Sequence, residues 1–338
     1  MRVSIDQFTV AFVDDPALGE SVAVLRREGS SSAEVRVAPS LGSNLYSYNV
    51  SGTELIYCDM ERLAQRKWTG NFVMWPIPNR VRNKRYTFEG KTTSLEDIDR
   101  GEGDGPCIHG LVDNQVFKVV NSSADASGAR VITSIAIVEG TPMFRHFPYA
   151  SRLTLTYELT SDAVTVFYRV ESLDDTPVPF GFGLHPYFAT FGEVDNTWVQ
   201  VQAADYMERA EGLIPTGRTL PVADSAFDAR EPQPVGSLSV DVDYLNLVPD
   251  APLVMSWDSL GKTLYCEASP DFEHSVLYTE VRDDFICLEY QTGATDMINL
   301  NEKAINTGDE ILRKDANLIV VQPGQSHEGF IRFRIAGN

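Results

Sequence analysis

The stretch Leu153-Thr154-Leu155-Thr156-Tyr157-Glu158-Leu159 decides the fold class of this chain. Its odd positions are apolar and its even positions polar, so an extended strand here turns one face to a core and the other to solvent. The alternation recurs at 331–335, and 131–138 and 164–170 are further β-branched or aromatic runs. Turn signals such as Asn121-Ser122-Ser123 and Pro323-Gly324 separate the runs. The pattern predicts an all-β protein with many short antiparallel strands.

Helical periodicity is scarce, and 60–67 is the segment that we expect to form a short helix. No low-complexity linker divides the 338 residues, and the glycine-rich segment 101–106 is predicted to be only a loop. The hydrophobic content of 43% is enough for a large core. We therefore predict that residues 1–338 form one large antiparallel β-sandwich domain.

The charge balance narrows the class of partner. Lys and Arg number 28 against 48 Asp and Glu, which gives a net charge of −20. Such a field repels phosphate backbones and anionic membrane surfaces, so we expect neither a nucleic acid nor a membrane as partner. A neutral small molecule fits better. We expect the protein to be a monomer or a homodimer.

The chain shows neither an apolar signal segment at Met1 nor an apolar run long enough to span a membrane. Its cysteines are far apart and lack Cys-x-x-Cys spacing, which predicts reduced thiols in a cytoplasmic protein. They are Cys58, Cys107, Cys266 and Cys287.

One histidine stands out in Pro177-Val178-Pro179-Phe180-Gly181-Phe182-Gly183-Leu184-His185-Pro186-Tyr187. The glycines before it let the main chain bend or approach a ligand closely, and the proline after it fixes φ. Because the ordinary pKa of an imidazole is near 6.5, His185 is a candidate proton donor. A structural histidine in a turn at a strand end is an equal alternative on this stretch alone.

A carboxylate continues the apolar strand Phe285-Ile286-Cys287-Leu288-Glu289-Tyr290-Gln291-Thr292. A charge there is costly unless it is paired or functional, and desolvation would raise the pKa of Glu289 and make it a stronger base. A structural salt bridge is the alternative. A β-sandwich can bring His185 and Glu289 together as an acid/base pair, which would serve hydrolysis, isomerisation or proton transfer equally well.

Two further segments concentrate polar groups. Arg80 follows the constrained run Pro76-Ile77-Pro78-Asn79, and its rigid fork of donors suits paired hydroxyls or a carboxylate. The step His109-Gly110 follows a glycine-rich loop and can present an imidazole to a cleft. Cys107 and His109 lack a second ligand pair at zinc spacing, so we expect no metal site.

In their order along the chain, these motifs resemble those of the aldose 1-epimerase (galactose mutarotase) family over nearly the whole length. The matching pieces are Pro78-Asn79-Arg80-Val81 with 86–91, His109-Gly110, 183–188, 213–217, 227–232 and 287–292. The resemblance implies a large antiparallel β-sandwich that interconverts the α and β anomers of a free hexose without a cofactor. Val242 and Tyr290 stand where the family often has histidine and proline, which indicates a divergent member.

The resemblance also implies roles for single residues. Glu289 falls on the general base and His185 on the general acid. Arg80, His109 and Asp241 fall on positions that contact sugar hydroxyls, with Asp243 as the alternative to Asp241.

Other functions compete on the same fold. A hexose-6-phosphate 1-epimerase would need cations around the phosphate, and possible contributors are Arg82, Lys84, Arg85 and Arg145. A non-catalytic sugar-binding protein is a second alternative. A glycoside hydrolase would need paired carboxylates, and only one buried carboxylate is convincing.

Overall fold

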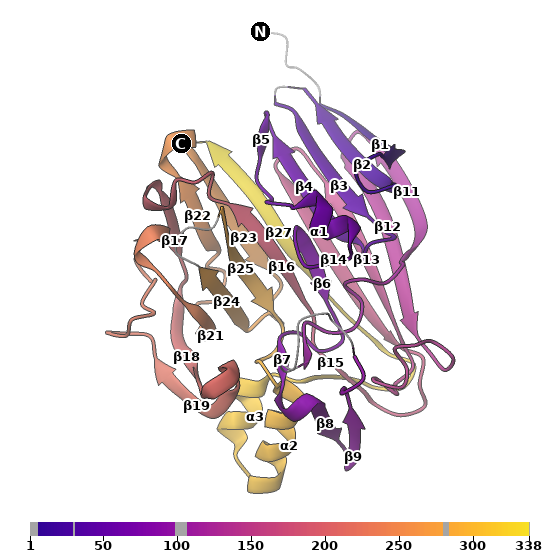
Figure 1. The fold of residues 1–338 in the computed structure, drawn as a ribbon, viewed down its shortest axis with the longest axis vertical. Helices are drawn as coiled ribbons and strands as arrows, with labels where there is room; N and C mark the ends of the chain where they lie inside the picture. Colours follow the sequence, from indigo (N-terminus) through magenta and orange to yellow (C-terminus); the bar gives the residue numbers. More distant parts are fainter. Residues whose placement is uncertain (1–5, 30, 99–106, 280–283, 338) are drawn as a thin grey trace.

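The computed structural model describes residues 6–29, 31–98, 107–279 and 284–337, and Figure 1 shows their arrangement. Within these ranges most strands belong to three antiparallel sheets. In spatial order the five-stranded sheet contains β1 (Gln7–Asp15), β2 (Glu20–Glu28), β3 (Ala33–Ala38), β4 (Asn44–Val50) and β5 (Thr53–Glu54). The nine-stranded sheet contains β11 (Lys118–Asp125), β12 (Gly128–Ile137), β13 (Ser151–Leu159), β14 (Ala163–Ser172), β27 (Ser326–Gly337), β23 (Lys262–Ala268), β22 (Leu253–Trp257), β17 (Thr197–Gln200) and β20 (Gln233–Pro234). The seven-stranded sheet contains β19 (Pro215–Pro221), β18 (Ala203–Arg209), β21 (Asp241–Leu247), β24 (His274–Thr279), β25 (Phe285–Gln291), β16 (Gly183–Ala189) and β6 (Asn71–Met74).

Short pieces complete the described fold. Two-stranded ladders join β7 (Arg80–Val81) to β10 (Cys107–Ile108), β8 (Arg85–Phe88) to β9 (Lys91–Ser94), and β15 (Val178–Phe180) to β26 (Ile319–Val321). The α-helices are α1 (Met60–Ala64), α2 (Met297–Thr307) and α3 (Glu310–Ala316). Single 3₁₀ turns are η1 (Arg82–Lys84), η2 (Val194–Asn196), η3 (Glu211–Leu213), η4 (Val235–Ser237) and η5 (Asp258–Leu260).

The alternating stretch that fixed the fold class is strand β13. Its apolar side chains are fully buried, whereas the polar ones between them are partly exposed. The runs predicted at 131–138, 164–170 and 331–335 fall on β12, β14 and β27. The expected all-β, antiparallel sandwich is confirmed.

Most buried apolar side chains form one cluster between the sheets. The five-stranded sheet packs on the β11–β14 half of the nine-stranded sheet, and Figure 1 shows these strands together on the right. The seven-stranded sheet contacts the other half: the rings of Phe188 and Phe333 lie 5.7 Å apart, and Trp257 Nε1 donates to the Ala189 carbonyl at 2.8 Å. One face of β16 and β25 is therefore fixed against the core.

The helix prediction was only partly right. Helix α1 (Met60–Ala64) lies within 60–67, and Asp59 caps its N-terminus by accepting from the N–H groups of Glu61 and Arg62. Helices α2 and α3 were not expected. The buried stripe of α2 is short, and intervening Asn and Thr residues resemble a loop. Gly308 at φ 71° ends α2, and Asp309 caps α3 by accepting from the Leu312 N–H at 3.0 Å.

Some sequence predictions are not tested by this fold. The glycine-rich segment 101–106 and the first five residues lie outside the described ranges. The organisation of 1–338 as one domain stays a prediction. Within the described ranges no helix is both long and apolar enough to cross a membrane.

Candidate active site

Neighbouring strands β16 and β25 place His185 directly opposite Glu289. Gly183 pairs with Gln291 and Tyr187 pairs with Cys287, and the constant register between these pairs sets the two residues face to face. His185 Nε2 lies 3.1 Å from Glu289 Oε1, and both side chains are almost fully buried. The structure therefore brings together the two residues expected to form an acid/base pair.

Burial shifts the two pKa values in opposite directions. Desolvation raises the pKa of Glu289 to about 8, against the lowering effect of the Gln291 amide, which donates to Oε2 at 2.8 Å. Desolvation lowers the pKa of His185 to about 3. The upward shift expected for Glu289 is confirmed. Near neutral pH the pair therefore holds one proton, which rests on the Glu289 carboxyl, and the imidazole of His185 is neutral.

His185 does not lie in a turn, contrary to one of the two interpretations of its segment. It belongs to β16, which pairs with β6 on its other side, where His185 is opposite Phe72. A Cβ on Gly183 would come within 2.8 Å of the Met74 side chain and 3.0 Å of the Tyr290 carbonyl, so this glycine lets neighbouring groups approach closely. Pro186 cannot donate a ladder hydrogen bond, and the β16–β25 pairing is interrupted there.

Aromatic rings hold the imidazole of His185 in place. Phe72 stacks on it with ring centroids 4.6 Å apart, and Tyr187 stacks at 5.1 Å. His109 approaches edge-on at 4.8 Å. His109 has φ 65°, and a Cβ on Gly110 would lie 2.5 Å from the Trp75 carbonyl oxygen, so the His-Gly step requires glycine. This turn brings the predicted binding residue His109 to the site.

Arg80 and Asp241 meet at the sugar-contact positions implied by the resemblance. The Arg80 guanidinium lies 3.4 Å from Asp241 Oδ2, and the Asn79 side chain accepts from the Arg80 N–H at 2.9 Å. Asn79 has φ 59°, which turns the chain into β7 after the prolines. The charges of Arg80 and Asp241 both act on Glu289, so all five predicted residues gather in one region.

The two candidate aspartates have different environments. The Asp241 side chain is 18% exposed, whereas the Asp243 side chain is 1% exposed. Asp243 accepts from His274 Nδ1 at 2.9 Å and from the Thr295 N–H at 3.1 Å. Burial alone would raise the pKa of Asp243, but His274 and Arg209 hold it below its ordinary value. This geometry favours Asp241 over Asp243 as the residue that reaches a ligand.

Sequence reasoning missed two residues of the site. Gln291 lies two positions after Glu289, on the same face of β25, and this strand spacing is a signal that could have found it. The second missed residue is Arg209, the last residue of β18. Its guanidinium donates a hydrogen bond to Asp241 Oδ1 at 2.6 Å. A single arginine in Ala203–Arg209 gives no signal, because the pairing of β18 with β21 is a tertiary property.

Three side chains of the site come close enough to share a metal ion. The possible donor atoms of His185, Cys287 and Glu289 all lie within 4.8 Å of one another. The set mixes one nitrogen, one sulfur and one oxygen donor, which suits a borderline-soft ion such as zinc. The first and last donors are the acid/base pair itself.

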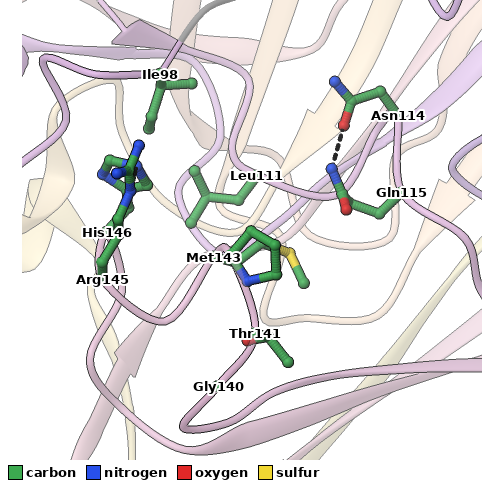
Figure 2. A pocket seen from close by; sticks show the side chains of 10 residues that line it. Ile98, Leu111, Asn114, Gln115, Gly140, Thr141, Met143, Arg145 and His146 are labelled. Atoms are coloured by element: carbon green, nitrogen blue, oxygen red, sulfur yellow. Dashed lines mark hydrogen bonds between the residues drawn. The ribbon is translucent and has the colours of Figure 1, made fainter.

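Three of the four basic residues considered for a phosphate have other partners in the structure. Arg82 lies 3.3 Å from the buried carboxylate of Asp296, and Arg85 lies 3.6 Å from Glu96. Arg145 lines a separate cavity of about 420 Å³ with Leu111 and Met143, which Figure 2 shows. There its Nε donates to His146 Nε2 at 2.8 Å. Arg82 and Arg85 are thus paired with carboxylates, and Arg145 belongs to a separate cavity.

Comparison with known proteins gives the class to which this fold and site belong. The family model described as aldose 1-epimerase matches residues 25–334. The aldose 1-epimerase of Escherichia coli K12 is 31% identical over 166 residues, 47% of this chain and 44% of that protein. Human galactose mutarotase is 33% identical over 94 residues, 27% of each chain. These matches span less than half the length of the two relatives.

The solved structures agree on the fold. A galactose mutarotase-like protein from Clostridium acetobutylicum superimposes with a TM-score of 0.82, covering 98% of this chain and 99% of that one at 16% identity. A putative aldose 1-epimerase from Escherichia coli K12 gives a TM-score of 0.72 over 98% and 100% of the two chains at 20% identity. The chain is a galactose mutarotase-like β-sandwich, and it belongs to the aldose 1-epimerase family.

Proposed function

We propose that the protein is an isomerase that interconverts the α and β anomers of a free, neutral aldohexose by acid/base ring opening. The observation that carries this proposal is the buried contact between His185 and Glu289 at 3.1 Å. A carboxyl group with a pKa near 8 and an imidazole with a pKa near 3 form a pair that holds one exchangeable proton at neutral pH. Membership of the aldose 1-epimerase family supports the same chemistry.

The mechanism moves that proton in a closed cycle. When the sugar binds, its anomeric hydroxyl faces Glu289 and its ring oxygen faces His185, with the proton now on the imidazole. Glu289 accepts the proton of the anomeric hydroxyl as His185 donates to the ring oxygen, so the C1–O5 bond breaks and an open-chain aldehyde forms. Glu289 is then protonated and His185 neutral, which is the resting distribution of the free pair.

Ring closure reverses both transfers. Rotation about the C1–C2 bond presents the other carbonyl face to the C5 hydroxyl. His185 takes the hydroxyl proton as Glu289 protonates the carbonyl oxygen, which regenerates the cyclic sugar as the other anomer. Arg80, His109 and Asp241 would bind the remaining hydroxyls and keep the open chain in place. No step needs a cofactor or an electron carrier.

The charges around the site favour a neutral sugar over a hexose 6-phosphate. The positive charges of Arg80 and Arg209 act on Glu289, and both guanidinium groups are paired with Asp241. A phosphate would have to compete with that carboxylate for them. A binding protein without catalysis would not need the desolvated carboxyl of Glu289, whose burial is costly.

Polarimetry tests the proposal. Freshly dissolved α-D-glucose and α-D-galactose should relax faster with the protein than in buffer, and glucose 6-phosphate should not. Glu289→Gln and His185→Asn should each remove roughly 10²–10⁴-fold of the catalysed rate. Glu171→Gln on β14 is the matched control and should retain full activity. A response to glucose 6-phosphate alone would replace the proposal with the phosphate function, and sugar binding without turnover would indicate a binding protein.

A further inference from the structure

Behind the sugar-contact residues lies a chain of alternating charges. It runs from His274 through Asp243, Arg209 and Asp241 to Arg80, and each member is within 4 Å of the next. Exposure rises along it: the side chains of His274 and Asp243 are 1% exposed, and those of Asp241 and Arg80 are nearly one-fifth exposed. The outer end therefore faces the ligand region, and the inner end is fixed in the protein.

The inner end is anchored by two hydrogen bonds of one imidazole. His274 Nδ1 lies 2.9 Å from Asp243 Oδ1, and Nε2 lies 2.9 Å from the Asp315 carbonyl oxygen. A carbonyl oxygen only accepts, so Nε2 carries a proton, and the carboxylate favours a second proton on Nδ1. Burial lowers the pKa of His274, but Asp243 and the carbonyl raise it above its ordinary value. Through these two hydrogen bonds His274 ties β24 and β21 to α3.

Arg209 links this anchor to the ligand side. One terminal nitrogen, Nη1, donates to Asp241 Oδ1 at 2.6 Å and to the Asp241 carbonyl oxygen at 3.0 Å. The other, Nη2, lies 3.5 Å from Thr295 Oγ1 and 3.9 Å from Asp243 Oδ2. The rigid fork spans both aspartates, which a single ammonium group cannot do. Asp241 Oδ1 is thereby committed to Arg209, and Oδ2 turns to Arg80.

We propose that Arg209 is a positioning residue that holds Asp241 in the orientation needed to bind a sugar hydroxyl, with His274 and Asp243 as its anchor. The inference rests on the proposed function, because it assigns Asp241 to sugar binding. Arg209 itself is 6% exposed and acts through Asp241. The predicted consequence is an effect on KM, since hydroxyl contacts hold the sugar while Glu289 and His185 carry out the proton transfers.

A double-mutant cycle between Arg209 and Asp241 tests this role. Arg209→Met should raise KM roughly 10- to 100-fold, the equivalent of one lost charged hydrogen bond, with a smaller change in kcat. In an Asp241→Asn background the same substitution should raise KM no further. Arg209→Lys keeps a positive charge at this buried position, so this variant should fold. Its KM should lie between those of the wild type and Arg209→Met. Arg230→Met, which removes a surface partner of Asp228, is the matched control and should leave KM unchanged.

The outcomes separate this inference from the proposed function. If the wild type is active and the effects of Arg209→Met and Asp241→Asn on KM are additive, Arg209 does not act through Asp241 and only this inference is overturned. The same holds if Arg209→Lys or Arg209→Met keeps the wild-type KM. A protein that binds sugars without turnover allows the same cycle in Kd. If the wild type neither binds nor converts any aldose, both proposals are overturned.

Discussion

His185 and Glu289 occupy opposed positions of two neighbouring strands, with Nε2 of the imidazole 3.1 Å from Oε1 of the carboxyl. Burial separates their pKa values to about 3 and about 8, so that over this whole interval the pair contains one proton. The same proton count describes the protonated carboxyl with a neutral imidazole and the carboxylate with an imidazolium. In the proposed mechanism, the first of these two states accompanies the open-chain aldehyde and the second accompanies the cyclic sugar.

The pH dependence of the rate follows from that proton count. The one-proton pair loses its proton as pH rises through about 8, the pKa of Glu289, and gains a second as pH falls through about 3. We expect kcat/KM for mutarotation, corrected for the buffer reaction, to be flat from about pH 5 to 7 and to fall tenfold per pH unit above 8. A rate that rises through pH 8 would show that the fully deprotonated pair is the active form.

The fold could be predicted because its signal is local. The alternation in β13 follows directly from the two-residue period of a strand, and nothing distant is needed to read it. Helix α2 shows the opposite case. Its apolar stripe of Met297, Ile298, Leu300 and Ala304 is short, and packing against α3 and β8 overrides the weak helix propensity of its Asn and Thr residues.

The site could be predicted only in part, for a related reason. The motifs and the family resemblance predict five site residues, and the structure places them in one region: His185, Glu289, Arg80, His109 and Asp241. The contact between His185 and Glu289 depends on the register of β16 against β25, which no spacing in the sequence encodes. Arg209 stayed hidden because its partner Asp241 lies on another strand, and only the folded chain brings them together.

The buried carboxyl should make stability depend on pH. The folded protein keeps the Glu289 proton up to about pH 8, whereas an unfolded chain loses it near 4.5, so stability falls as pH rises between these values. Glu289→Gln removes this dependence. We expect its Tm, relative to wild type, to increase steadily from pH 5 to 8 and to change little beyond pH 8. The Glu171→Gln control should show a constant difference. A Tm difference for Glu289→Gln that does not vary with pH would mean that Glu289 ionises normally.

Removal of metal ions gives a further test of the acid/base mechanism. An ion held by His185, Cys287 and Glu289 would occupy the lone pairs that the proposed proton transfers use. We therefore expect dialysis against EDTA to leave the rate of glucose mutarotation unchanged. Zinc added to the dialysed protein should inhibit, because it would compete with protons for the same donors. Loss of activity on dialysis and recovery with zinc would contradict the mechanism.

Gln291 should determine the pH at which kcat/KM begins to fall on the alkaline side of the profile, here called the alkaline limb. Its amide nitrogen donates to Glu289 Oε2 at 2.8 Å and so favours the charged carboxylate. Gln291→Leu keeps the volume but removes the donor, so the pKa of Glu289 should rise above about 8. The fall in kcat/KM should then begin at a higher pH than in the wild type. The exposed residue Gln325 supplies the matched control, and Gln325→Leu should leave the profile in place. An alkaline limb that stays fixed, or moves to lower pH in Gln291→Leu, would show that the limb reports a group other than Glu289.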